Sequence, residues 1–229
     1  VLKRMRFGFS FLVTAAMERN LKSVTTPKQA RSQATLTRLL DAAEELFLQN
    51  PPQDVSIADI VRRAGSSIGG FYSRFADKDA LLRALQERRL VVVQQMLETI
   101  ADPERWRDVP LSLMVRGLLQ ELVRHYTERR RLIAAFVSAA AQNPREWADT
   151  VQRRDAMIEV VLRLIVPQHR EAIRHPDPER AIRFATHAAF AVMDTYAIRL
   201  ALDDSVWRDP PELVDELHRM YMGYLEREP

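Results

Sequence analysis

The chain has 229 residues, of which 47% are hydrophobic and 28% are charged, so its composition is that of a globular protein with a sizeable core. The absence of cysteine excludes disulfides, thiolate metal sites and cysteine nucleophiles, and it is consistent with the reducing environment of the cytoplasm. No apolar run reaches the roughly 18 residues of a membrane span, so we expect no membrane partner.

Positive charge is concentrated at the front of the chain. Residues 1–76 hold 11 Lys and Arg against 6 Asp and Glu, a net charge of +5, whereas the remaining residues hold 23 against 25, a net charge of −2. This asymmetry favours a head that binds a polyanion, joined to a body of a different kind.

Residues 1–16 have the basic start, the apolar run and the small residues of a short secretory signal. Met17, however, begins a polar segment and is a candidate for an alternative start. We therefore interpret residues 1–28 as a basic arm that is disordered or partly ordered, or as an upstream extension of the natural start.

Four helices are expected in the front part of the chain. Residues 31–49 place their apolar side chains on one stripe with helical spacing, and a Pro-Pro pair follows them. Ser56 caps a second helix, which Gly65 terminates. Two serines then cap a short third helix, and Asp77 caps a longer one that extends to residue 100.

The third helix contains an unusual stretch, SSIGGFYSRF at residues 66–75, in which two glycines are adjacent. With the preceding helix and the tight turn, it forms a helix-turn-helix motif. In such a motif the second helix, which is the third helix of this chain, enters the major groove of DNA. Both glycines fall in the first turn of that helix, where small residues let the backbone approach DNA. We expect Phe71 and Phe75 to point inward and Tyr72 to point outward. The alternative is that the glycines form a loop and that Tyr72 is a core aromatic.

Residues 56–85 read SIADIVRRAGSSIGGFYSRFADKDALLRAL, and they resemble the DNA-binding region of TetR/AcrR-type bacterial transcriptional regulators. The resemblance covers roughly residues 31–85 and implies that the partner is double-stranded operator DNA. Nine residues fall where family members touch DNA: Ser56, Ser66, Ser67, Gly69, Gly70, Tyr72, Ser73, Arg74 and Lys78. Ile68 stands where many members carry Lys or Arg, and Gly70 stands where Ser or Thr is frequent. Base readout is therefore expected to depend on Tyr72, on backbone groups and on DNA shape.

The rest of the chain is also expected to be helical, with helices at 110–127, 129–141, 145–166, 178–202 and 210–227 separated by prolines. The predicted fold is all-α, with a three-helix helix-turn-helix domain at 29–76 and a helical body at 77–229. The resemblance implies that this body binds a small-molecule effector and forms a homodimer.

Two helices of the body are candidates for the dimer interface. Residues 178–202 are apolar on nearly all sides, which requires burial on all sides, and residues 210–227 carry an apolar stripe. Two such helices from each subunit would form a four-helix interface, with these residues: Phe190, Tyr196, Leu213, Leu217, Met220, Tyr221 and Tyr224. The alternative is that both helices belong to an internal core.

The candidate ligand residues are adaptable apolar side chains and polar residues on apolar helices: Trp106, Met114, His125, Phe136, Trp147, His187, Phe190 and Asp194. Asp194 needs a partner, which is a cationic ligand, an arginine of its own subunit or an arginine across the dimer. His187 is interpreted as a hydrogen-bonded core histidine. The expected effector is small and either apolar or amphipathic.

An enzyme is the main alternative from another class, but the sequence lacks G-x-S-x-G, a phosphate-binding glycine loop and H-E-x-x-H. A di-iron bundle needs two Glu-x-x-His motifs, whereas this chain offers Asp215 three residues before His218 and Glu121 four residues before His125. We expect no catalysis, no metal and no cofactor. The preferred interpretation is a repressor that its effector releases from the operator, although activation is also open. The second alternative is a non-specific or adaptor-type DNA-binding protein without an effector.

Overall fold

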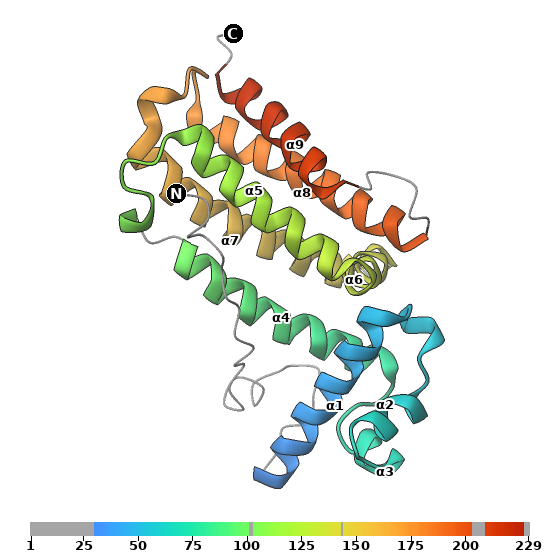
Figure 1. Ribbon diagram of the computed structural model, residues 1–229. Helices are drawn as coiled ribbons and strands as arrows, with labels where there is room; N and C mark the ends of the chain where they lie inside the picture. Colours follow the sequence, from blue (N-terminus) through green and yellow to red (C-terminus); the bar gives the residue numbers. More distant parts are fainter. Residues whose placement is uncertain (1–29, 101–102, 143, 203–208, 227–229) are drawn as a thin grey trace. The chain divides into compact units, whose positions relative to one another are not determined.

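The computed structural model describes residues 30–100, 103–142, 144–202 and 209–226, and the regular elements within these ranges are all helical (Figure 1). The predicted all-α fold is therefore confirmed. The expected arm at residues 1–28 lies outside the described residues. The chain divides between Gln94 and Gln95 into two compact units, called the head and the body below.

The head contains α1 (Ala30–Gln49), α2 (Ile57–Arg63), α3 (Ile68–Tyr72) and the first part of α4 (Lys78–Ile100). A 3-10 turn, η3 (Pro52–Asp54), connects α1 to α2. Apolar side chains from all four helices, and Phe75 just after α3, are completely or almost completely buried. They form one core: Leu36, Leu39, Leu40, Phe47, Ile60, Phe71, Phe75, Leu81 and Leu85.

The ends of α2 are fixed by the residues that the sequence singles out. The Ser56 hydroxyl accepts a hydrogen bond from the backbone N–H of Asp59, whose carboxylate accepts one from the Ser56 N–H, so a complete capping box begins the helix. Gly65 ends it with a φ of 56°, and the N–H of Ser66 reaches back to the carbonyl of Val61 at 2.9 Å. This C-terminal motif turns the chain sharply towards α3.

The first part of α4 is bound to α1 through a buried arginine. The Arg88 side chain is only 6% exposed, and it contacts Glu44 at 2.5 Å and Asp41 at 2.6 Å. These contacts and the buried Leu81 and Leu85 therefore place the first part of α4 within the head. The helix α4 itself continues through the boundary after Gln94.

Within the described residues, the body contains the end of α4 and five further α-helices, which include every helix that the proline spacing predicts (Figure 1). These five are α5 (Leu111–Glu128), α6 (Arg130–Gln142), α7 (Pro144–His169), α8 (Pro178–Leu202) and α9 (Pro210–Leu225). The helix α5 packs along α9, and α8 lies against α6, α7 and α9. Two 3-10 turns, η4 (Pro103–Trp106) and η5 (Arg170–Ala172), complete the unit.

The predicted end of α7 before Pro167 differs from the structure, in which the helix continues to His169. A proline this close to a helix end disturbs few backbone hydrogen bonds, so it need not terminate the helix at once. Within the described ranges, the helices fall short of the length and apolarity that crossing a membrane requires.

Candidate functional site

The short helix α3 has a buried side and an exposed side, as the sequence predicts. Phe71 and Phe75 are buried in the head core with ring centroids 5.3 Å apart. Tyr72 is 55% exposed and Ile68 is 47% exposed, and both side chains lie on the outer side with Ser73. The alternative in which Tyr72 is a core aromatic is therefore wrong.

The fold favours glycine at one of the two adjacent glycine positions of α3 and not at the other. A Cβ on Gly70 would lie 2.7 Å from the Ser66 hydroxyl and 3.2 Å from the Ser67 hydroxyl, which itself accepts a hydrogen bond from the Gly70 N–H. The cap of the helix therefore favours glycine at residue 70. A Cβ on the exposed Gly69 would meet no described atom closer than 4.0 Å, so the described fold does not require glycine there.

Several predicted DNA-contact residues already make hydrogen bonds within the head. The Lys78 ammonium donates to the carbonyls of Pro52 at 2.9 Å and Val55 at 3.2 Å, and so holds the segment that precedes α2. Ser73 and Arg74 both donate to the carbonyl of Gly70, at 3.0 and 2.7 Å. Like the capping Ser56 and Ser67, these groups therefore shape the surface around α3, and their contact with DNA stays a prediction.

Arg38 of α1 is a cationic residue beside α3 that the sequence interpretation did not select. Its Nε donates to the carbonyl of Ala64, at the turn between α2 and α3, over 3.2 Å. Burial and the nearby positive charge of Arg38 together lower the pKa of Arg74. A phosphate next to this arginine pair would offset their mutual repulsion. The sequence carried no signal for Arg38, because its proximity to Arg74 depends on how α1 packs.

In the body, Asp194 of α8 is buried and has partners from its own chain. It accepts a hydrogen bond from the Tyr126 hydroxyl at 3.0 Å and forms an ion pair with Arg154 of α7. The Arg154 guanidinium also lies 5.7 Å from the centroid of the Phe190 ring, close enough for a cation–π interaction. Of the three predicted kinds of partner for Asp194, the structure contains the arginine of the same chain.

The other predicted ligand residues are dispersed. Trp106, Met114 and Phe136 are buried, while His125 is half-buried on α5. The interpretation of His187 as a core histidine is wrong, because this residue is exposed on α8 and lies 3.5 Å from Asp155. Trp147 belongs to α7, but its side chain lies outside the described part of the structure.

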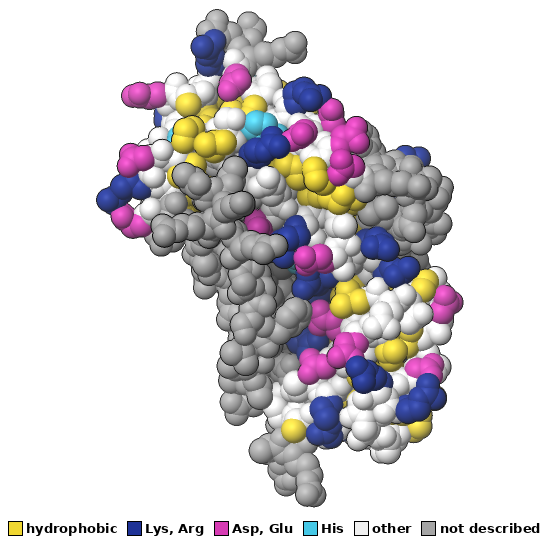
Figure 2. Space-filling view, viewed as in Figure 1, with side chains coloured by type: hydrophobic (Ala, Val, Ile, Leu, Met, Phe, Trp, Pro, Cys, Tyr) yellow, Lys and Arg dark blue, Asp and Glu magenta, His cyan; other side chains and the backbone are white. Residues whose placement is uncertain are grey.

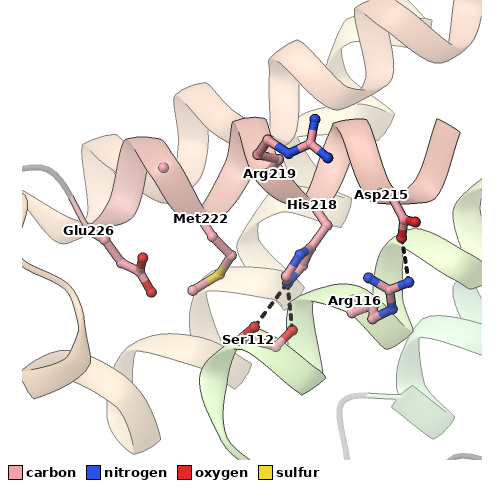
Figure 3. A pocket seen from close by; sticks show the side chains of 8 residues that line it. Ser112, Arg116, Asp215, His218, Arg219, Met222 and Glu226 are labelled. Carbon is pink, nitrogen blue, oxygen red and sulfur yellow. Dashed lines mark hydrogen bonds and ion pairs between the residues drawn. The ribbon is translucent and has the colours of Figure 1, made fainter. Parts of the chain in front are cut away.

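An open hollow of about 480 Å³ lies between α5 and α9 (Figure 3). Nε2 of His218 donates to the carbonyl of Ser112 at 2.9 Å and lies 3.1 Å from the Ser112 hydroxyl, and Arg116 pairs with Asp215. In the sequence, Asp215 and His218 have the spacing of a Glu-x-x-His metal motif but lack its glutamate. Their spacing places both on the face of α9 towards α5, where their partners come from residues about a hundred positions away.

A second hollow of about 300 Å³ shares Arg116 with the first and is lined by apolar groups of Val123, Val214 and the Pro210-Pro211 pair. The α5–α9 surface therefore offers a polar region next to an apolar one. This combination suits a molecule that has both a polar group and an apolar part.

Both parts of the chain match sequence models of one family. The model described as "Bacterial regulatory proteins, tetR family" matches residues 39–85, and the model described as "Tetracyclin repressor-like, C-terminal domain" matches residues 110–225. The chain belongs to the tetR family. It is therefore a transcriptional regulator with a helix-turn-helix DNA-binding domain.

Individual relatives of this tetR-family chain are distant. The HTH-type transcriptional regulator UidR of Escherichia coli is 25% identical over 158 residues, which cover 67% of this chain and 76% of UidR. A putative TetR-family regulator from Mesorhizobium loti has a TM-score of 0.63 at 17% identity, covering 86% of this chain and 98% of that one. NalD of Pseudomonas aeruginosa, described as the secondary repressor of the MexAB-OprM multidrug efflux pump, has a TM-score of 0.56 at 22% identity, covering 86% and 100%. These structures share the fold.

The residues predicted for a dimer interface of this tetR-family regulator are mostly internal. Five are buried within the chain: Phe190, Tyr196, Leu213, Leu217 and Tyr221. The Tyr221 hydroxyl lies 2.8 Å from that of Thr186, and burial raises the pKa of Tyr221 to about 12. Apolar periodicity marks the buried side of a helix without telling whether its own chain or a partner buries it.

Other apolar side chains reach the surface of α8 and α9. Phe184, Val192 and Met220 are exposed, and the Phe184 ring lies with its centroid 5.0 Å from that of the half-buried Tyr224. We call these four residues the α8–α9 patch. On the face of the molecule drawn in Figure 2, hydrophobic side chains likewise interrupt the charged surface.

Proposed function

We propose that this tetR-family regulator is a homodimeric repressor in the cytoplasm, which binds a near-palindromic operator and is released from it by a small amphipathic effector. The observation that carries the proposal is the outer side of α3. There, Ile68, Gly69, Tyr72 and Ser73 are exposed on a helix whose opposite side is fixed in the head core by Phe71 and Phe75.

In this proposal α3 lies in the major groove with its outer side towards the base edges. Tyr72 offers a hydroxyl and a ring, while the exposed Gly69 lets the backbone come close. Arg38 and Arg74, whose charges lie near each other, contact phosphates beside the groove. The capping serines and Lys78 fix the turn and the connecting segment, so that α3 keeps one orientation.

The α8–α9 patch is the proposed dimer interface. A second copy that covers Phe184, Val192, Met220 and Tyr224 would remove their apolar surface from water. A twofold axis through such an interface places two heads on one DNA duplex, with half-sites ~34–36 Å apart. Sedimentation at micromolar concentration should then give a dimer, and Phe184→Asp should give a monomer.

The proposed effector site is the α5–α9 surface, where Ser112, Arg116 and His218 provide polar groups and Val123 and Val214 provide apolar contact. NalD, whose fold this chain shares, is described as a repressor, and this supports repression of transcription rather than activation. An effector acts only through its difference in affinity between the two states. To move the ratio of the two states from 1:99 to 99:1, the effector must bind one state more tightly than the other by about 5.5 kcal/mol.

Binding to the DNA upstream of its own gene tests the DNA part of the proposal. Fluorescence anisotropy at two salt concentrations should give nanomolar binding that survives competitor DNA, and this binding should weaken in Tyr72→Phe and Arg74→Ala. Arg107→Ala, which removes an exposed, ion-paired arginine of the body, is the charge-matched control and should bind like the wild type. Weak, strongly salt-dependent binding that is equal on random DNA would instead favour the non-specific DNA-binding alternative.

The effector part is tested with the same complex. A panel of amphipathic compounds should contain members that lower the anisotropy of the operator complex in a saturable way. Arg116→Ala should shift the half-maximal concentration of such a compound while leaving DNA affinity without it unchanged. Release that is identical in both proteins would place the effector elsewhere in the body.

A further inference from the structure

Ile68 and Tyr72 are the two large hydrophobic side chains that are exposed within the described part of the head. They are four residues apart on α3 and therefore lie on the same side of the helix. A single exposed apolar residue is ordinary on a protein surface. Two on the outer side of a five-residue helix, with the unexplained Gly69 between them, indicate an apolar contact with something outside the chain.

The chemistry of Ile68 narrows what that contact is. An isoleucine side chain has no charge and no hydrogen-bond donor, so it gains nothing from a phosphate or from the polar edge of a base. In the major groove the distinctive apolar group is the 5-methyl group of thymine. Placing Ile68 against a base edge without this methyl group would bury a polar group without a partner, which is unfavourable.

We infer that Ile68 reads the 5-methyl group of one thymine in each operator half-site. The inference rests on the proposed function, because it requires α3 to lie in the major groove. The neighbouring Gly69, which has no Cβ, lets this part of α3 come close enough for van der Waals contact with the methyl group. Ile68 is then a specificity-determining residue, and it prefers thymine where a Lys or Arg in the same place would contact phosphate or guanine.

The test uses the full chain and DNA that it selects from a random library. Each thymine of the selected site is replaced, one at a time, by deoxyuridine, which differs only in lacking the methyl group. For the wild type, one thymine per half-site should be sensitive, with a loss of about fourfold in affinity per methyl group removed. In Ile68→Ala the same replacement should change affinity by much less, because the side chain that contacts the methyl group is gone.

Two controls keep the result interpretable. Ile68 is exposed, so Ile68→Ala should retain the circular dichroism spectrum and the thermal midpoint of the wild type. Leu113→Ala removes a similarly exposed large apolar side chain from α5 in the body, and it should leave the whole pattern of thymine sensitivity unchanged.

The outcomes separate the inference from the proposed function. Specific binding in which uridine replacement affects wild type and Ile68→Ala equally, or affects neither, overturns the role of Ile68 alone. Equal binding to selected and random DNA overturns the proposed regulator and, with it, the inference.

Discussion

The polar contacts that stabilise the head and those that stabilise the body differ in their separation along the chain. In the head, the turn from α2 to α3 is closed by near neighbours, with Ser66 bonded to Val61 and Gly70 bonded to Ser67. In the body, polar contacts join residues of different helices, such as Arg154 with Asp194. A short motif thus fixes the outer surface of α3, whereas the body's polar sites depend on the packing of a whole unit.

The largest expected effect comes from the buried ion pair between α4 and α1 in the head. Arg88→Ala removes the partner of Glu44, whose side chain is almost completely buried, and should destabilise the head by about 3–5 kcal/mol. Urea denaturation followed by circular dichroism measures this loss, and DNA binding should disappear with it. The double variant Arg88→Met with Glu44→Leu removes both charges and should recover most of the stability. A single variant as stable as the double one would contradict the buried-charge explanation.

A smaller loss is expected from the corresponding contact in the body. Asp194→Ala leaves Arg154 without its carboxylate and Tyr126 without its acceptor, and should reduce the free energy of unfolding by about 2–3 kcal/mol. Asp194→Asn keeps an acceptor for Tyr126 and should lose less. The measurement is urea denaturation monitored by tryptophan fluorescence. Equal losses in both variants would show that the charge of Asp194 is unimportant.

Two glycines of the head should respond in opposite ways to the same substitution. Gly65→Ala forces a side chain into a left-handed conformation and should cost about 1–2 kcal/mol of stability. Gly69→Ala occupies open space in a helix and should leave stability unchanged or raise it by up to ~1 kcal/mol, yet it should weaken binding to the operator. Thermal unfolding and anisotropy, measured on both variants, check this. Normal operator binding by Gly69→Ala would remove the close-approach explanation.

The smallest effect concerns pH and lies in the body. Burial lowers the pKa of His169, and its Nε2 has no hydrogen-bond partner among the described residues. The unfolded chain therefore takes up this proton more readily, so stability is lost as the pH falls below the unfolded value of about 6.5. His169→Gln should show a flatter dependence of unfolding free energy on pH between about 5 and 7. If the stability of His169→Gln depends on pH as steeply as that of the wild type, the pH dependence comes from other histidines.

The sequence was sufficient wherever the cause of the structure is local. Ser56, Asp59 and Gly65 delimit α2 as expected, and the spacing of Phe71, Tyr72 and Phe75 separates the two sides of α3. These features depend on caps, on backbone angles and on helical periodicity over a few residues.

Where the cause is long-range packing, the sequence was insufficient. The periodicity that selected Leu213 and Leu217 marks a buried side, and only the structure shows that their own chain buries it. The nearness of Arg38 to Arg74, and that of Ser112 to His218, arises from the docking of helices far apart in sequence. A histidine on an apolar helix likewise gives no indication that it faces outward, as His187 does.

The division of α3 into an anchored side and an outer side makes the head suitable for engineering. Phe71 and Phe75 anchor this helix in the core, whereas Ile68, Gly69, Tyr72 and Ser73 are exposed. Under the proposed function, a combinatorial library at Ile68, Gly69 and Tyr72 would sample new operator sequences while the buried core of the head stays unchanged. The selected variants would differ in operator preference and share one body.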